Sequence, residues 1–355
     1  MQCLSQRLDE TAKGLHPLIF KEKAAGFVAR RLLRFQDPLG LQAWIVLAAV
    51  IAAVLILKPA PESGAWFWAL SLLIVGLPHG AFDLEAIRQL AGSSCPRVSY
   101  FVILARYVLI MALCIVFLVT APMLGLLSFL ALSCHHLGHS DSVWTRHQAR
   151  PKFSARIPAW GHGLIVITAP FYFSPQAAWA PFERIVVFFG GQASLSTEAF
   201  RMAALWCLVA AVVALVVGFT ELIKKRRSEE FLQQLVVLGL SFLLAAVAPP
   251  LLSVGVYFVA VHAMGHCSTA SVPPRSNALP VSYANVLRVH LRSLPLLIPS
   301  LIIVGLVSSQ LNSAMSLPER LATASIFFYA IVTLPHHLLW SGNKFLSTII
   351  SRPSA

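Results

Sequence analysis

Residues 250–271 read PLLSVGVYFVAVHAMGHCSTAS, an uncharged and mostly apolar run that is long enough to cross a bilayer as a helix. Two histidines in this run, His262 and His266, are four residues apart, so a helix places them on one face, one turn above the other. Imidazole has two ring nitrogens that need partners when apolar groups surround them. The pair is therefore either buried structure with partners on other segments or half of a metal site.

The composition of the whole chain indicates a membrane protein, as this apolar run does. The 355 residues are 57% hydrophobic and only 12% charged, with a mean hydropathy of +0.76. A soluble globular domain carries roughly 25% charged residues. The apolar runs of this chain are roughly twenty residues long, enough to span a hydrocarbon core of ~30 Å. The sequence therefore predicts an all-α fold, a polytopic integral membrane helix bundle.

We expect about ten transmembrane helices. They lie near residues 42–58, 66–87, 98–120, 122–145, 157–174, 200–223, 230–248, 250–271, 293–309 and 319–340, and the long connection at 175–199 is expected to be an interfacial segment. The chain then divides into a basic amphipathic cytoplasmic segment at 1–41, a single transmembrane domain with the histidines at 42–345, and a short cytoplasmic tail at 346–355. The basic segment is either a helix lying on anionic lipid or a solvated tail.

The formal net charge of +13 comes mainly from lysine and arginine residues that lie between the apolar runs. Basic residues are frequent in alternate connections, at 1–41, 88–97, 146–156, 224–227, 272–292 and 344–352, and rare at 59–65, 121, 175–199, 249–250 and 310–320. This alternation fits the positive-inside rule with both termini in the cytoplasm. Because the charges follow the topology and form no separate patch, no nucleic-acid partner is expected.

This topology places histidines from four helices at one depth in the membrane. The second, fourth, eighth and tenth helices run from outside to inside, and their cytoplasmic halves carry His79; His135, His136 and His139; His262 and His266; and His336 and His337. A lone intramembrane histidine such as His162 is more often a hydrogen-bonded structural residue than a ligand. Polar groups in lipid cost free energy and face the bundle interior, so convergence of several helices favours a site.

Neutral imidazole suits iron, copper, zinc and nickel. The pair His262 and His266 lacks the glutamate of an H-E-x-x-H motif, so a zinc protease is not indicated. Several imidazoles around one iron with open coordination positions suit oxygen chemistry on an apolar substrate that enters from the lipid. Two acids, Asp83 and Asp141, follow histidines closely, and they either accept N–H bonds from ligand imidazoles or cap helix ends.

Four motifs of this chain resemble those of the Brp/Blh family of membrane-bound β-carotene 15,15′-dioxygenases. GLPHGAFD at 76–83 is like the family's G-x-P-H-G-A-x-D, and HLGHSD at 136–141 is similar to its H-F-G-x-x-D. YFVAVHAMGH at 257–266 resembles Y-F-x-x-W-H-S-x-R-H, and TLPH at 333–336 looks like T-L-P-H. The chain departs from these patterns at Leu137, Ala263 and Gly265, where the family has Phe, Ser and Arg.

The resemblance implies that Fe(II) is the cofactor of an oxidoreductase. Its ligands would be His79, His136, His262 and His266. Additional residues of the site would be His336 and His139, with Asp83 and Asp141 behind the ligands.

The resemblance also implies the reaction, in which β-carotene and O2 give two molecules of retinal. The partners would then be the carotenoid, O2 and the lipid bilayer, in the cytoplasmic (inner) membrane of a bacterium, with a rhodopsin as the user of the retinal. Residues expected to line the path of the polyene, where they share the histidine face, are Phe82, Tyr257, Phe258 and Trp340.

Two other classes of function are open at this point. Membrane desaturases and hydroxylases hold two irons with H-x-x-x-H and H-x-x-H-H clusters, and the histidines at 135–139, 262–266 and 336–337 have that form. Their histidines usually lie in polar segments beyond the membrane, whereas most of these fall within apolar runs. The other class is a non-catalytic membrane protein that carries haem, metal or carotenoid.

Overall fold

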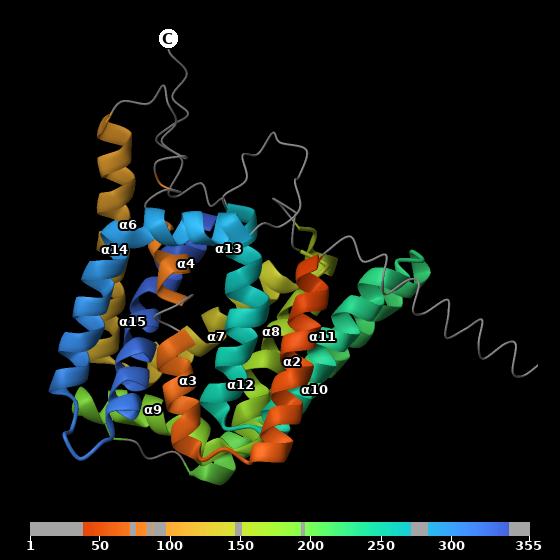
Figure 1. The fold of residues 1–355 in the computed structure, drawn as a ribbon, viewed down its shortest axis with the longest axis horizontal. Helices are drawn as coiled ribbons and strands as arrows, with labels where there is room; N and C mark the ends of the chain where they lie inside the picture. The colour runs from red at the N-terminus through yellow and green to blue at the C-terminus, as the bar shows by residue number, and fades with distance from the viewer. Residues whose placement is uncertain are drawn as a thin grey trace, which may run out of the picture.

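The computed structural model describes residues 38–71, 76–83, 87, 97–145, 151–192, 196–270 and 283–340. Within these ranges every regular element is helical and none is a strand. The elements are α2 (Pro38–Leu57), α3 (Pro61–Ser71), α4 (Leu77–Ala81), α6 (Arg97–Thr120), α7 (Pro122–Asp141), α8 (Phe153–Phe173), α9 (Pro175–Phe188), α10 (Thr197–Lys224), α11 (Ser228–Val247), α12 (Pro250–Tyr257), the π-helix η2 (Phe258–Ala263), α13 (Met264–Ala270), α14 (Tyr283–Gln310) and α15 (Leu317–Trp340). Most of the long helices run side by side (Figure 1).

Six of the described helical segments are long and apolar enough to cross a membrane. They are Tyr100–Thr120, Thr197–Lys224, Ser228–Val247, Pro250–Cys267, Leu287–Gln310 and Leu317–Leu339. Helix α2 is apolar but shorter, from Leu41 to Leu57 within the described side chains. The all-α prediction is confirmed for the described residues, and the apolar helices are those of a membrane protein. The count of about ten spans and the cytoplasmic placement of both termini stay predictions.

The predicted segment 66–87 differs most from its expected form. Helix α3 ends at Ser71 and α4 covers only Leu77–Ala81, so the described residues hold two short helices where one span was expected. The basic N-terminal segment up to residue 37 and the predicted tail at 346–355 lie outside the described residues.

Helix α15 is the most deeply buried of the six apolar segments. In its most apolar stretch 61% of the residues are buried, against 17% in α6, which therefore lies at the periphery. Helix α15 packs against α3, α6, α7, α9 and α14. Histidines near the end of α15 therefore lie inside the protein, away from lipid.

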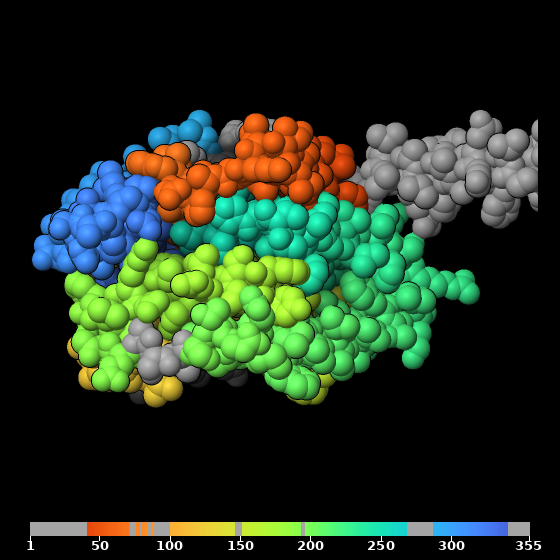
Figure 2. Space-filling view, turned by 90° about the horizontal axis from the view of Figure 1, so that it is seen from below, coloured from red at the N-terminus to blue at the C-terminus, as the bar shows by residue number. Residues whose placement is uncertain are grey.

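Helix α9 lies across one end of the bundle (Figure 1). It occupies the first part of the expected interfacial connection and begins with Pro175, whose missing N–H costs nothing at the start of a helix. Figure 2 looks onto this end, where the yellow-green segment lies between the green α10 and the blue α15, in agreement with the contacts of α9 with both. The ends of α7 and α15 that carry the histidines point away from α9.

Helices α7 and α8 approach each other at two glycines. A Cβ on Gly138 would lie 1.9 Å from the carbonyl oxygen of Ala159, and one on Gly163 would lie 1.8 Å from that of Cys134. No side chain fits in such a contact, so glycine is required at both positions. This contact fixes α7 against α8, and among the neighbouring histidines of α7 His135 also contacts α8, where it stacks on Trp160.

Candidate metal centre

Four histidines from α7, η2, α13 and α15 form a closed ring of contacts. The ring centroids are 4.9 Å apart for His136 and His262, and 5.2 Å apart for His136 and His336. They are 5.7 Å apart for His266 and His336, and 6.4 Å apart for His262 and His266. His136, His262 and His336 are buried and His266 is partly buried. The fold thus joins three of the histidine-bearing segments that the sequence places at one depth.

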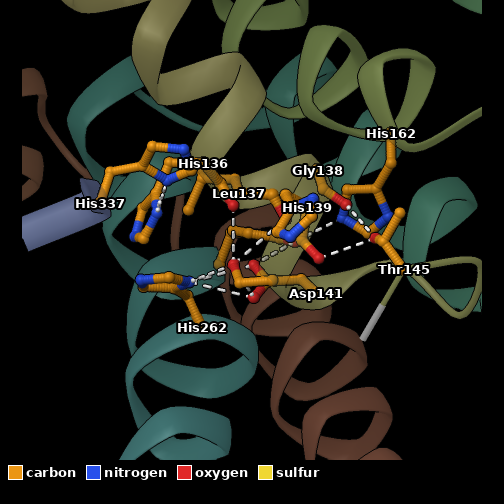
Figure 3. A network of polar contacts seen from close by, with 11 residues as sticks. His136, Leu137, Gly138, His139, Asp141, Thr145, His162, His262 and His337 are labelled. Carbon is orange, nitrogen blue, oxygen red and sulfur yellow. Dashed lines mark hydrogen bonds and ion pairs between the residues drawn. The ribbon is translucent and has the colours of Figure 1, made fainter. Parts of the chain in front are cut away.

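A π-helical turn shapes the segment that carries His262. On an α-helix the side chains of residues i and i+5 point about 140° apart, so Tyr257 and His262 would face different neighbours. The wider i→i+5 turn of η2 brings them toward the same face. Both reach Asp141 at the end of α7: Tyr257 Oη donates to Oδ2 across 3.0 Å, and His262 Nδ1 lies 3.0 Å from Oδ1. Figure 3 shows Asp141 beside His262, below His136.

Asp83, just after α4, makes the same kind of contact with His336. Its Oδ1 lies 2.8 Å from His336 Nδ1, and its Oδ2 accepts a hydrogen bond of 2.8 Å from Tyr107 Oη of α6. The carboxylate is 2% exposed, so solvent does not compete for it. Each of two ring histidines therefore has a carboxylate behind it, and each carboxylate is held by a tyrosine.

These contacts decide the protonation pattern of both imidazoles. An ionised carboxylate only accepts hydrogen bonds, so Nδ1 of His262 and Nδ1 of His336 carry the ring proton. In the neutral form of each ring, Nε2 is then the nitrogen with the lone pair that can bind a metal ion. The acids that the sequence analysis places behind the ligands, or at helix ends, thus orient two histidines of the ring.

A second group of histidines lies next to the ring. His135 and His139 of α7 have centroids 5.7 Å apart, and His337 of α15 lies 4.8 Å from the first and 6.3 Å from the second. His135 also stacks on Trp160 of α8 at 5.0 Å. His337 connects the two groups, because its Nδ1 lies 3.1 Å from Nδ1 of His136. The predicted additional residue His139 therefore belongs to this second group.

The ring suits a metal in its chemistry and nearly in its spacing. Two imidazoles bound to one metal through bonds of about 2.1 Å have centroids roughly 4.5–5.5 Å apart, and the two shorter distances of the ring fall in that range. Among the described residues no group of three or more His, Cys, Asp or Glu side chains is already set to hold an ion. His79 adds its backbone to α4, but its side chain lies outside the described residues. The donors are imidazoles, two of them backed by carboxylates, and such a set fits iron.

An apolar cavity extends from His136 toward α9. Its wall is mostly aliphatic and aromatic and includes Phe129, Phe171, Phe182, Phe258 and Tyr329. Of the three hydroxyl residues in the wall, two bond to their own helices: Ser133 Oγ donates to Phe129 O, and Thr333 Oγ1 donates to Tyr329 O. The third, Tyr329, has no hydrogen-bond partner for its Oη among the described residues. The donors of Ser133 and Thr333 are therefore satisfied, and the cavity offers a mostly apolar surface, with the Tyr329 hydroxyl in its wall and the imidazole of His136 at its end.

The predicted polyene-lining residues separate in the structure. Phe258 lines this cavity. Phe82 is fully buried against Cys267 and Val289, Tyr257 is bonded to Asp141, and neither is part of the cavity wall. The side chain of Trp340 lies outside the described residues.

The departures from the family motif between His262 and His266 differ in their surroundings. Ala263 is completely buried, so a larger or polar side chain there would need space and a partner. A Cβ on Gly265 would meet no atom within 4 Å, so packing does not require glycine at that position.

Four residues outside the predicted site also hold this arrangement, although His337 was among the histidines expected at one depth and His162 was expected to be a hydrogen-bonded structural residue. Tyr107 holds Asp83, His337 contacts His136, and His162 and Gln234 form a hydrogen-bonded pair beyond Tyr257. The available signal was a polar residue inside an apolar run, since such a group needs a partner in the bundle. No motif or spacing connects Tyr107, His162 or Gln234 to the ring, and only their positions in space do.

The fold and the ring define a helical membrane protein with a buried, carboxylate-backed cluster of imidazoles beside an apolar cavity. Residues 70–342 match the family described as beta-carotene 15,15′-dioxygenase. This match covers most of the chain, so the protein belongs to that family, and the predicted membership is confirmed. The family supports carotenoid dioxygenase-type chemistry and implies a carotenoid substrate. No curated protein and no solved structure matches the chain.

Proposed function

We propose that this protein cleaves the central double bond of a carotenoid, converting β-carotene and O2 into two molecules of retinal. The carbon–carbon double bond breaks and each of its two carbons receives one oxygen atom. Both atoms of O2 therefore end in the two aldehydes, and no further co-reactant is needed. The observation that carries this proposal is the apolar cavity that ends at His136, inside the histidine ring of a chain from this family.

The residues that would hold iron are His79, His136, His262 and His266, with His336 beside them. Bound as Fe(II), the metal would supply the activation of O2. Asp141 and Asp83 keep their imidazoles in one orientation and one tautomer, so that Nε2 is presented without a proton.

The cavity would select the bond that is cleaved. A polyene has many similar double bonds, so the reaction needs the central one held at the ring while the ends of the chain are fixed by contacts along the wall. Phe258 lies next to His262, and Tyr329 lies next to Phe258, whereas Phe182 of α9 contributes another part of the wall. The apolar wall also excludes water from the reacting bond.

The substrate dissolves in lipid, so we place the reaction inside the bilayer. The apolar helices agree with this location. We assign the protein to the cytoplasmic membrane of a bacterium, where a rhodopsin would use the retinal.

The test is expression in a bacterium that accumulates β-carotene. The expected result is loss of colour, with retinal identified by chromatography at two molecules per carotene consumed. His262→Ala, expressed to the same level, should leave the carotene intact. Unchanged carotene with well-expressed, iron-loaded wild-type protein would overturn the proposed activity.

The second group of histidines supports one alternative, a di-iron enzyme that acts on a lipid. His135, His139 and His337 lie next to the ring and offer three further imidazoles. Iron counted per purified chain separates the two functions, since the dioxygenase needs one iron and the di-iron enzyme needs two.

A further inference from the structure

A buried chain of hydrogen bonds leads from α11 to the histidine ring. Gln234 of α11 contacts Nδ1 of His162 through its side-chain Nε2, and His162 Nε2 lies 2.5 Å from Tyr257 Oη. These three side chains are only 2%, 1% and 1% exposed, respectively. Neither Gln234 nor His162 touches the apolar cavity or belongs to the two groups of histidines. Their polar atoms in the middle of a helical membrane protein therefore need another explanation.

The far end of this chain is fixed by the backbone. The Val143 N–H donates to Gln234 Oε1 across 3.1 Å. A backbone N–H can only donate, so the oxygen of the Gln234 amide must face Val143, and the amide nitrogen must face His162. That nitrogen is a donor, so Nδ1 of His162 accepts and carries no proton. The ring proton of a neutral His162 is then on Nε2.

The same logic continues to the ring. His162 Nε2–H donates to Tyr257 Oη, and the hydroxyl proton of Tyr257 is directed to Asp141 Oδ2, 3.0 Å away. If Tyr257 donated to His162 instead, Tyr257 Oη and Asp141 Oδ2 would face each other at 3.0 Å with no proton between them. Asp141, held by Tyr257, accepts from His262 Nδ1. Each donor in the series thus points from Val143 toward Asp141.

We propose that Gln234 and His162 are positioning residues of the metal centre, which direct the Tyr257 proton to Asp141 and so hold the ring proton of His262 on Nδ1. They do not touch the metal or the substrate. They act through Asp141, whose orientation decides whether Nε2 of His262 is presented to the metal. The consequence for metal binding rests on the proposed function, whereas the proton positions do not.

Substitutions that differ in donor and acceptor pattern separate this role from simple packing. Gln234→Glu keeps an acceptor for Val143 but removes the donor to His162. It should therefore reverse the direction of the hydrogen bonds from His162 onward. His162→Leu should interrupt it. His162→Gln should preserve it, since a glutamine accepts through Oε1 and donates through Nε2. Ser241→Ala is the control, because the hydroxyl of this buried residue of α11 bonds, within the described part of the chain, only to Val237 O of its own helix.

The first measurement is ¹⁵N nuclear magnetic resonance of histidine-labelled, metal-free protein in lipid nanodiscs. In the wild type we expect His162 protonated at Nε2 and His262 protonated at Nδ1. In Gln234→Glu the proton of His162 should move to Nδ1, and His262 should show a mixture of tautomers. A wild-type His162 with its proton on Nδ1 would overturn the proposal, whatever the protein binds.

The second measurement is titration of the same proteins with Co(II), followed by its visible absorption. Gln234→Glu and His162→Leu should weaken Co(II) binding roughly tenfold, as expected for groups behind a ligand, while His162→Gln and Ser241→Ala should bind like the wild type. Wild-type affinity in both Gln234→Glu and His162→Leu contradicts the positioning role. If the wild type binds no Co(II), the proposed metal centre fails, and the tautomers of His162 and His262 still decide the present inference.

Discussion

Nδ1 of His336 lies 2.8 Å from Oδ1 of Asp83, although 253 residues separate them in the sequence. The contact joins the end of α15 to the residues just after α4. A similar contact joins His262 to Asp141 on the other side of the ring. Both carboxylates are buried and accept a hydrogen bond from a tyrosine, so they hold two of the ring imidazoles in defined orientations.

Replacing either carboxylate should weaken metal binding without unfolding the protein. Asp141→Asn and Asp83→Asn keep the shape of the side chain but remove the charge that holds the Nδ1 proton. We expect metal affinity to fall roughly 10- to 100-fold in each variant. Competition titration with Fe(II) or Co(II) measures this loss, and Glu183→Gln, an exposed acid on α9, is the matched control. Equal affinity in Asp141→Asn and in the control would show that Asp141 has no part in the metal centre.

The two groups of histidines should respond differently to alanine substitution. His262→Ala and His266→Ala remove proposed ligands, so purified protein should lose its iron and its carotenoid cleavage. His135→Ala, which removes a stacking partner of Trp160, should retain both. Metal analysis of detergent-purified chains gives the answer. A loss of half the iron in His135→Ala would favour the di-iron enzyme.

Filling the apolar cavity should stop cleavage while leaving the iron in place. Ala178 of α9 is 5% exposed and lines the cavity, whereas its neighbour Ala177 is exposed on the outside. Ala178→Trp places an indole where the polyene would lie, and Ala177→Trp adds the same group elsewhere. We expect retinal formation to fall at least about tenfold in Ala178→Trp, equivalent to about 1.4 kcal/mol of lost binding, with normal iron content. Full activity in that variant would remove this cavity from the proposed mechanism.

The close contact between α7 and α8 should tolerate no side chain. Gly138→Ala would place a Cβ 1.9 Å from the carbonyl oxygen of Ala159, so the helices must separate. We expect a loss of about 1–3 kcal/mol in the free energy of unfolding, together with weaker metal binding because His136 lies on the same helix. Gly239→Ala, where a Cβ meets no atom within 4 Å, is the control. Denaturation in mixed detergent micelles measures the difference.

The helical class and the histidine-bearing segments were predictable from the sequence. A run such as 250–271 can satisfy its backbone in lipid only as a helix. Histidines in runs of this kind must face the protein interior. The family motifs identified four proposed ligands, and the family match confirms the resemblance on which that identification rests.

Other parts of the centre were decided only by the tertiary structure. Tyr257 and His262 share Asp141 because a π-turn replaces the α-helical turn between them, and hydropathy does not distinguish these turns. His162 and Gln234 gained a proposed role for a similar reason, since polar groups in separate helices find their partners only when the helices pack. The sequence by itself thus determined an all-helical membrane chain and predicted that its histidines lie at one depth. Packing alone decided which imidazoles meet and which nitrogen each one presents, because hydrogen bonds depend on distance and direction in space.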